Sequence, residues 1–256
     1  MSAPVLLVTG AAQGIGAAVA HRFASEGYAV ALLDRQRKAL YSIVGTLEAK
    51  GCQALGLTVD IVDSHDTENA VTRVEHELGP IKVLVNAAGI LLPGTILDYS
   101  DDDWDTTFAI NAGGVFKVSR AVARRMAARR QGTIVTVSSN AAAIPRLGMA
   151  AYAASKAAVT HFSHCLALEM AEYGVRCNVV SPGSTDTPMQ RALWADQNGE
   201  AKTIAGSPGQ WKLGIPLARI ATPSDIADAV FFLASAQARH ITMHDLRVDG
   251  GATLSA

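Results

Sequence analysis

The sequence predicts an α/β fold of a single domain, with a doubly wound parallel sheet between two layers of helices in a three-layer αβα arrangement. Two observations predict it. Short runs rich in Val, Ile and Leu alternate along the whole chain with longer segments of helical periodicity, as is typical of βαβ units. Nearly all of these runs are apolar on both faces, as parallel strands covered by helices must be.

The first two expected strands are marked by a recognisable feature of the sequence. The run 5–8 leads into a glycine-rich turn, and the run 29–34 ends in Asp34. The other strands are expected at 54–58, 83–85, 132–138, 175–180 and 246–248. No linker, low-complexity tract or repeat divides the 256 residues, so we expect one domain spanning 1–256.

The regular alternation breaks between residues 183 and 215. This segment holds five glycines, two tryptophans and two prolines, and Pro182 and Pro216 flank it. Such a composition predicts a loop with short helices that lies over a site, as a lid does. The sequence leaves open whether the segment closes when a ligand binds.

The charge and cysteine content exclude several classes of function. With 22 basic and 23 acidic side chains, the chain has no strong field for gripping polyanions, so we expect no nucleic-acid partner. Three widely spaced cysteines predict neither a disulfide framework nor a zinc site. No apolar stretch approaches the ~20 residues of a membrane span, and no secretory leader is recognisable, so a cytoplasmic location is expected.

A glycine-rich turn follows the first expected strand, in the order TGAAQGIG from Thr9 to Gly16. Glycines allow a tight turn, and the helix that follows offers free N–H groups and a positive dipole end to a pyrophosphate. This glycine spacing also occurs in turns that bind no ligand, so the surrounding sequence must show whether the turn belongs to a dinucleotide site. The residues of this turn expected to contact a cofactor are Gly10, Gln13, Gly14, Ile15 and Gly16.

Asp34 supplies that context, because it lies 18 residues beyond Gly16, where a carboxylate can accept hydrogen bonds from the adenosine ribose. A carboxylate repels the 2′-phosphate of NADP, and Gln13 stands where an NADP enzyme offers a basic residue. The sequence therefore favours NAD. Arg35 and Arg37 lie nearby and are interpreted as a solvated helix start.

Two further strand ends supply candidate cofactor contacts, since ligands lie beyond the carboxyl ends of parallel strands. One is Asp60, for which a helix cap is the alternative interpretation. The other is the run NAAG, from which Asn86, Ala87 and Gly89 are candidates. These small residues also allow close backbone packing, and we expect both roles.

The chemistry is expected at Ser139, Tyr152 and Lys156. Tyr152 and Lys156 are four residues apart, so a helix places them on one face. A tyrosine with a pKa near 10 needs a shift of about 3 units to act as a base near neutrality. A lysine ammonium at ~4 Å can supply an interaction of that size, and an oxidised nicotinamide ring adds further positive charge. We expect Tyr152 to take a hydroxyl proton, Ser139 to hydrogen-bond the substrate oxygen, and Asn111 to hold a water that connects Lys156 to solvent.

A Tyr-x-x-x-Lys pair alone is more often a surface pair than a catalytic one, but here it stands with other motifs. The turn from Thr9 to Gly16, the run NAAG, Asn111, Ser139, Tyr152, Lys156 and the run PGSTDT from Pro182 together resemble the short-chain dehydrogenase/reductase family over the whole chain. The resemblance implies a Rossmann-type fold and a catalytic tetrad of Asn111, Ser139, Tyr152 and Lys156. It also implies nicotinamide contacts from Tyr152 and Lys156 and from Pro182, Gly183, Thr185 and Thr187.

The more variable segments resemble one branch of that family, whose substrate is a small cyclohexadiene diol with a carboxylate. Similar segments are 145–149, 175–190, 212–217 and 240–242. The resemblance implies that NAD oxidises the C3 alcohol and that the ketone tautomerises to an aromatic catechol in siderophore biosynthesis. Reduction of a 3-oxoacyl thioester or a sugar ketone is the alternative, and a nicotinamide-binding scaffold without turnover is a third interpretation, opposed by the presence of Tyr152 and Lys156.

An anionic substrate requires a cation in the site. Arg146 is the first candidate because it lies between Ser139 and Tyr152 and a guanidinium suits a carboxylate. A surface or subunit-contact arginine is the alternative. Arg191 and Lys212 are weaker candidates, each expected to be solvated. Met189, Gln190, Leu193 and Trp194 are expected either to line the pocket or to seat the 183–215 segment.

Three other patterns receive structural interpretations. The basic cluster of Arg124, Arg125, Arg129 and Arg130 is interpreted as a solvated helix end, where cations complement the macrodipole. His161 and His164 lack a third ligand at suitable spacing, so no metal site is expected. Alanines between 150 and 171 allow close helix packing, from which a homo-oligomer is expected, and the family resemblance implies a tetramer.

Overall fold

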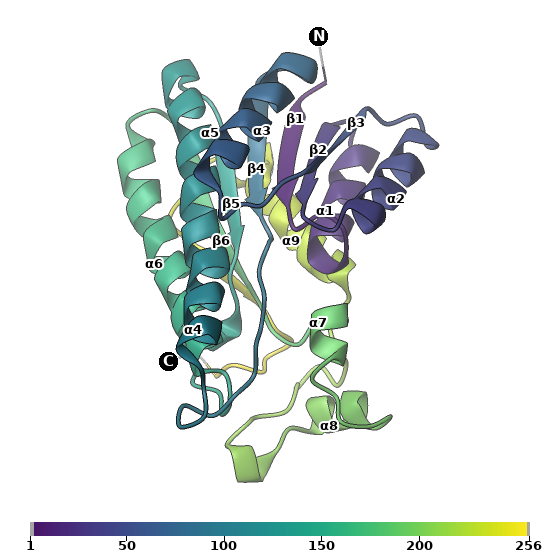
Figure 1. Cartoon of the computed structure of the whole chain (residues 1–256), viewed down its shortest axis with the longest axis vertical. Coiled ribbons are helices and arrows are strands. Elements are labelled where there is room, and N and C mark those ends of the chain that lie inside the picture. Colours follow the sequence, from purple (N-terminus) through teal and green to yellow (C-terminus); the bar gives the residue numbers. More distant parts are fainter. Residues whose placement is uncertain (1–2, 255–256) are drawn as a thin grey trace.

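A computed structural model describes residues 3–254, which form one seven-stranded sheet with helices on both faces (Figure 1). The strand order is β3-β2-β1-β4-β5-β6-β7, and every neighbouring pair is parallel. The predicted doubly wound αβα fold is therefore confirmed. Met1, Ser2, Ser255 and Ala256, the ends of the predicted domain 1–256, lie outside the described residues.

The strands are β1 (Val5–Thr9), β2 (Ala29–Asp34), β3 (Ala54–Thr58), β4 (Ile81–Asn86), β5 (Thr133–Val137), β6 (Arg176–Pro182) and β7 (Asp245–Val248). The α-helices are α1 (Gly14–Ser25), α2 (Arg37–Glu48), α3 (Ser64–Glu77), α4 (Asp101–Phe108), α5 (Val115–Arg129), α6 (Ala150–Ala171), α7 (Pro188–Arg191), α8 (Gly199–Ala205) and α9 (Pro223–Ala234). Two predicted strands have the observed bounds, and the others differ by one or two residues at their ends.

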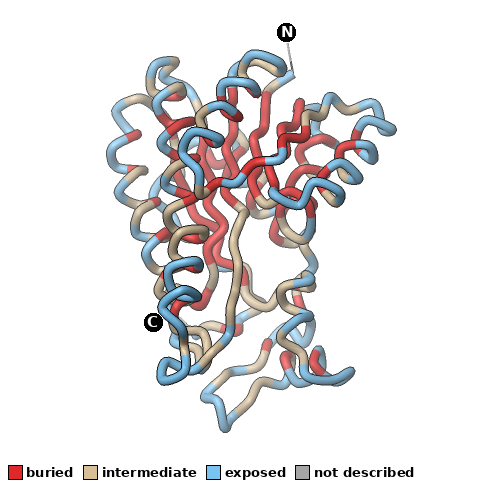
Figure 2. Tube along the Cα trace, in the orientation of Figure 1, coloured by how far each residue is buried: buried red, intermediate tan, exposed pale blue. Residues whose placement is uncertain are grey.

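The two faces of the sheet are covered by different helices. Leu6 and Val8 of β1 belong to the apolar cluster under α1, α2 and α9, whereas Val5 and Leu7 belong to the cluster under α3, α5 and α6. Every residue of β1, β2 and β5 is buried, and the buried trace runs through the centre of the molecule (Figure 2). Both-sided burial explains why these runs are apolar at consecutive positions.

The sheet reverses its winding at β1, because β2 and β3 lie on one side of it and β4 to β7 on the other. The turns after β1 and β4 are joined there, since the Thr9 hydroxyl oxygen accepts hydrogen bonds from the backbone N–H groups of Ala87 and Ala88, both at 3.2 Å. Ligands bind at such a switch point, beyond the carboxyl ends of the strands.

The segment 183–215 lies beyond those carboxyl ends (Figure 1). It contains α7, α8 and a short 3₁₀ turn, Pro208–Gln210. Trp194 and Ile204 pack on a small apolar cluster of Ile215, Ile220 and Ala252, which anchors the segment separately from the main core.

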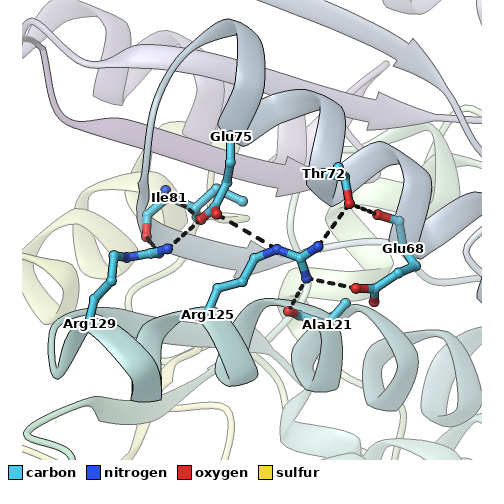
Figure 3. Close-up of polar contacts among 7 residues, drawn as sticks. All are labelled: Glu68, Thr72, Glu75, Ile81, Ala121, Arg125 and Arg129. Carbon is cyan, nitrogen blue, oxygen red and sulfur yellow. Dashed lines mark hydrogen bonds and ion pairs between the residues drawn. The ribbon is translucent and has the colours of Figure 1, made fainter.

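The interpretation of the basic cluster on α5 as a solvated helix end is wrong for two of its arginines, Arg125 and Arg129. Figure 3 shows Arg125 and Arg129 reaching to α3, where Arg129 pairs with Glu75 at 2.8 Å and Arg125 pairs with Glu68 at 2.9 Å. Arg125 also donates to the Thr72 hydroxyl at 2.8 Å. Parallel packing of α3 and α5 on one face of the sheet brings these charges together, a proximity that spacing along one helix does not reveal.

Within residues 3–254, no helix is both long enough and apolar enough to cross a membrane. In the same range, His, Cys, Asp and Glu form no group of three that could hold a metal ion. His161 and His164 lie on α6 with ring centroids 6.4 Å apart.

Candidate active site

Two adjoining cavities lie at the carboxyl edge of the sheet. The first, here called the glycine cavity, has a volume of about 480 Å³ and lies against the turn from Gly10 to Gly16, the end of β2 and Asp60. The second, here called the tyrosine cavity, has a volume of about 210 Å³ and lies among Ser139, Tyr152 and the 183–215 segment. Both are lined by Ile15, Ala87, Gly89, Leu91, Thr187 and Met189, so the two cavities are continuous.

The glycine turn has the geometry that a dinucleotide requires. A Cβ on Gly10, whose φ is +67°, would lie 2.7 Å from the Cα of Ala88, and a Cβ on Gly16 would lie 2.1 Å from the Gly10 carbonyl oxygen. α1 begins at Gly14 without a side-chain cap and without an acidic residue in its first turn. Its N-terminus therefore offers uncapped N–H groups and a positive dipole end to a phosphate, and these residues fit the cofactor.

Asp34 lines the same cavity at the end of β2 and is 9% exposed. Its Oδ2 accepts a hydrogen bond from the Ala12 N–H at 3.1 Å, and its Oδ1 accepts one from the Gln36 N–H at 2.9 Å. Each carboxylate oxygen keeps a second lone pair. Asp34 is thus held in place by the backbone on both sides, which fixes a negative charge in the cavity wall.

Of the two polar residues predicted to contact the cofactor from the ends of β3 and β4, only Asp60 lines a cavity. Asp60 lines the glycine cavity, and the helix cap proposed for it as an alternative is wrong, because Asp63 caps α3 by accepting from His65 and Asp66. Asn86 lines neither cavity. Its side chain is buried and donates to Ser119 on α5 at 2.9 Å, and the expected cofactor contact from Asn86 stays a prediction.

The remaining predicted cofactor residues line one cavity or the other. Gly10, Gln13, Gly14, Ile15, Gly16, Ala87, Gly89 and Thr187 line the glycine cavity, and Pro182, Gly183, Thr185, Tyr152 and Lys156 line the tyrosine cavity.

Ser139, Tyr152 and Lys156 meet at the tyrosine cavity although they lie on different elements. Ser139 follows β5, while Tyr152 and Lys156 are one turn apart on α6. The Lys156 Nζ lies 5.8 Å from the centre of the Tyr152 ring and donates to the Val137 carbonyl at 2.9 Å. One helix face and one strand end thus form a compact polar group in the wall of this cavity.

Burial dominates the proton affinities of this group. It lowers the pKa of the Lys156 ammonium to about 8. Burial also raises the pKa of the Tyr152 hydroxyl, and the Ser139 hydroxyl offsets only part of that effect. Burial thus opposes the lowering of the Tyr152 pKa that we expect from Lys156 together with the positive charge of an oxidised nicotinamide. The physical reason is that a buried phenolate loses its hydration, while the lysine donates to a carbonyl of β5.

Asn111 lies outside both cavities, behind Lys156. It stands in a single π-helical segment, Ala109–Gly114, between α4 and α5, and it is fully buried. Its Oδ1 accepts from the Ile90 N–H at 2.8 Å, and its Nδ2 donates to the Ile90 carbonyl at 2.9 Å and to the Ser155 hydroxyl at 3.0 Å. Both side-chain N–H groups are thus engaged with protein atoms, while Oδ1 keeps a second lone pair, and the water expected at Asn111 stays a prediction.

The tyrosine cavity is also lined by the predicted substrate residues Ser139, Arg146, Met189 and Gln190, together with Leu193. Trp194 does not line the cavity and instead packs against the cluster that anchors the segment. Arg191 pairs with Asp186 at 2.6 Å outside the cavity. Lys212, expected to be solvated, is half-buried and lines the cavity, because the loop after α8 folds back over it.

Sequence reasoning missed two residues behind the site. Ser155 is buried, accepts from Asn111 and donates to the Tyr152 carbonyl at 2.7 Å. Val137 contributes only its carbonyl oxygen to Lys156. The spacing Tyr152, Ser155, Lys156 was a usable signal for Ser155, since residues three apart share a helix face. A backbone acceptor such as Val137 leaves no signal in the sequence.

Residues 4–198 match the sequence model of the short chain dehydrogenase family. The chain belongs to this family. It is 54% identical over 250 residues to a 2,3-dihydro-2,3-dihydroxybenzoate dehydrogenase of Bacillus subtilis, covering 98% of this chain and 96% of that protein. It is 44% identical to the Escherichia coli protein of the same name, covering 97% and 96%.

The fold is likewise shared with solved structures. An actinorhodin polyketide ketoreductase determined with NADPH superimposes with a TM-score of 0.90 at 32% identity, covering 98% of this chain and 99% of that one. The sequence matches and the structural match therefore indicate the same family and the same three-layer fold.

Proposed function

We propose that this protein oxidises 2,3-dihydro-2,3-dihydroxybenzoate to 2,3-dihydroxybenzoate with NAD, as a step in the biosynthesis of catechol siderophores. One observation carries the proposal: Tyr152, Ser139 and Arg146 line the same small cavity. A ring whose C3 hydroxyl lies at Tyr152 can thus present its carboxylate to a cation in the same space. Near full-length similarity to relatives that bear this enzyme's name supports the same conclusion.

Four residues of the chain have separate roles in the proposed reaction. Tyr152 accepts the proton of the C3 hydroxyl, and Ser139 donates a hydrogen bond to the same oxygen. Lys156, anchored on Val137, keeps a positive charge behind the phenol. Asn111 holds the loop at Ile90 and, through Ser155, the first turns of α6. When bound, oxidised nicotinamide supplies the hydride acceptor and a second positive charge that favours the phenolate.

The glycine cavity would hold that cofactor. The turn from Gly10 to Gly16 and the N-terminus of α1 suit the pyrophosphate, and Asp34 suits the adenosine ribose. The fixed carboxylate of Asp34 opposes a 2′-phosphate, and the neutral Gln13 adds no compensating cation. These contacts support a preference for NAD over NADP.

Further parts of the proposal concern the whole molecule. We place the protein in the cytoplasm, which is consistent with its three unpaired cysteines, all among the described residues. We propose a homotetramer, because Trp104, Phe116 and Leu168 are exposed on α4, α5 and α6. Light scattering of the purified protein tests this assembly.

The segment 183–215 is proposed to act as the lid of a single domain.

The function is tested by following the absorbance of NADH formed from purified protein, NAD and 2,3-dihydro-2,3-dihydroxybenzoate. NADP and a cyclohexenediol without the carboxylate are run in parallel. We expect fast turnover that depends on NAD and on the carboxylate. Absence of turnover with the dihydrodiol, combined with reduction of 3-oxoacyl thioesters or sugar ketones, would assign the protein to another branch of the family.

A further inference from the structure

Two cations face the tyrosine cavity from separate parts of the chain. Arg146 lies in the segment between β5 and α6, and Lys212 lies in the loop after α8. Both side chains are half-buried. Within residues 3–254 neither belongs to an ion pair, whereas Arg191 and Lys202 of the same 183–215 segment each pair with an aspartate.

The two charges act on each other. Burial lowers the pKa of Lys212, and the positive charge of Arg146 lowers it further. Burial also lowers the pKa of Arg146, while Asp249 acts in the opposite direction to a smaller extent. The carboxylate of Asp249 accepts hydrogen bonds from the Asn140 side chain at 3.3 Å and the Gly251 N–H at 3.0 Å. Partly desolvated like charges are unfavourable until an anion lies between them.

The backbone around Lys212 is closely held. Ser207 and Lys212 form an antiparallel bridge, with N–H to carbonyl distances of 2.9 and 3.0 Å. At the base of this loop, a Cβ on Gly206 would lie 2.4 Å from the Gly214 nitrogen, and a Cβ on Gly214 would lie 2.4 Å from the Ile204 carbonyl oxygen. Lys212 therefore starts from a fixed backbone position at the rim of the cavity and is not carried by an open loop.

We infer that Lys212 and Arg146 form a two-cation subsite that binds the carboxylate of the substrate from two sides. This inference rests on the proposed function, since the subsite consists of the residues that bind the carboxylate of the proposed substrate. The carboxylate then connects the 183–215 segment, through Lys212, to the wall that carries Ser139 and Tyr152. An uncharged diol lacks this connection, so the subsite selects carboxylated rings.

Calorimetric binding of two probes, 2,3-dihydroxybenzoate and catechol, to the full-length protein with NADH tests the subsite. The variants are Lys212→Gln, Arg146→Gln, the double variant, Lys212→Arg and the control Lys202→Gln, whose lysine pairs with Asp196 instead. We expect Lys212→Gln to weaken 2,3-dihydroxybenzoate about 10- to 100-fold, as for loss of a hydrogen bond to a charged group, and to change catechol less than about 2-fold. Lys212→Arg restores most of the affinity, and Lys202→Gln has no effect.

The double variant gives a second readout. If both cations bind one carboxylate, the combined loss is expected to differ from the product of the two single losses by about 3-fold or more. Unchanged binding of 2,3-dihydroxybenzoate by Lys212→Gln overturns the inference. Equal losses for 2,3-dihydroxybenzoate and catechol also overturn it, because they indicate a merely structural role.

Turnover of the dihydrodiol separates this inference from the proposed function. Normal oxidation by the wild-type protein, with an unchanged KM in Lys212→Gln, refutes the subsite and leaves the function intact. No oxidation by the wild-type protein, together with selective loss of 2,3-dihydroxybenzoate binding in Lys212→Gln, supports the subsite and refutes the proposed reaction.

Discussion

Replacing Asn111 by alanine tests whether its side chain holds the site together. The change removes three hydrogen bonds, with lengths of 2.8, 2.9 and 3.0 Å, from a position with no solvent exposure. At about 1 kcal/mol each, their loss lowers the free energy of unfolding by about 3 kcal/mol. For a chain of this size that corresponds to a decrease in Tm of about 6–12 °C.

Thermal unfolding followed by circular dichroism measures this effect at fixed protein concentration. Ser155→Ala is a comparison variant, because it removes the Asn111 bond to Ser155 and the Ser155 bond to the Tyr152 carbonyl but keeps both Asn111 bonds to Ile90. At about 1 kcal/mol for each of its two bonds, we expect Ser155→Ala to lower Tm by about two thirds as much as Asn111→Ala. A decrease of less than about 3 °C in Asn111→Ala, or an equal decrease in both variants, would refute the assignment of stability to the Ile90 contacts.

Three further predictions concern catalysis, pH and the cofactor. Tyr152→Phe is expected to lower kcat by about 10²- to 10⁴-fold with NAD affinity retained, and near-normal turnover would exclude Tyr152 as the base. Because the folded pKa of Lys156 is about 8 and its unfolded value is higher, the unfolded chain binds more protons between pH 8 and 10.5. The unfolding free energy of the wild type, minus that of Lys156→Met, should therefore rise by about 3 kcal/mol across this range in denaturant titrations, and a flat difference would contradict the buried-lysine assignment. Asp34→Asn is expected to improve kcat/KM for NADP relative to NAD by about tenfold or more in parallel NADH and NADPH assays, whereas an unchanged ratio would show that Asp34 does not select the cofactor.

Much of the fold was predictable because its causes are local. A strand buried on both faces must be apolar at consecutive positions, and this requirement marks β1, β2 and β5 in the sequence. The glycines that approach other backbone atoms, such as Gly10 and Gly16, are visible for the same reason, since no side chain fits there. Tyr152 and Lys156 share a helix face by spacing alone.

Other features could not be predicted from the sequence, because partners distant in the chain decide them. The position of Asn86 at a strand end gives no sign that its side-chain amide donates a hydrogen bond to Ser119 of α5. Arg125 and Arg129 looked solvated, and α3 supplies their acidic partners. Burial raises the pKa of Tyr152, and this effect depends on everything packed around the phenol, which spacing along α6 does not reveal.

The sequence by itself determined the layered α/β architecture, the glycine turn and the types of residue that meet at the reaction site. These features follow from periodicity, from the need for small residues at close approaches, and from helical spacing. Only the tertiary structure decided that Lys212 faces the same cavity as Arg146 and that Asn111 joins Ile90 to Ser155. Such contacts depend on how segments far apart in the chain pack together, and charge, burial and hydrogen bonding follow from that packing.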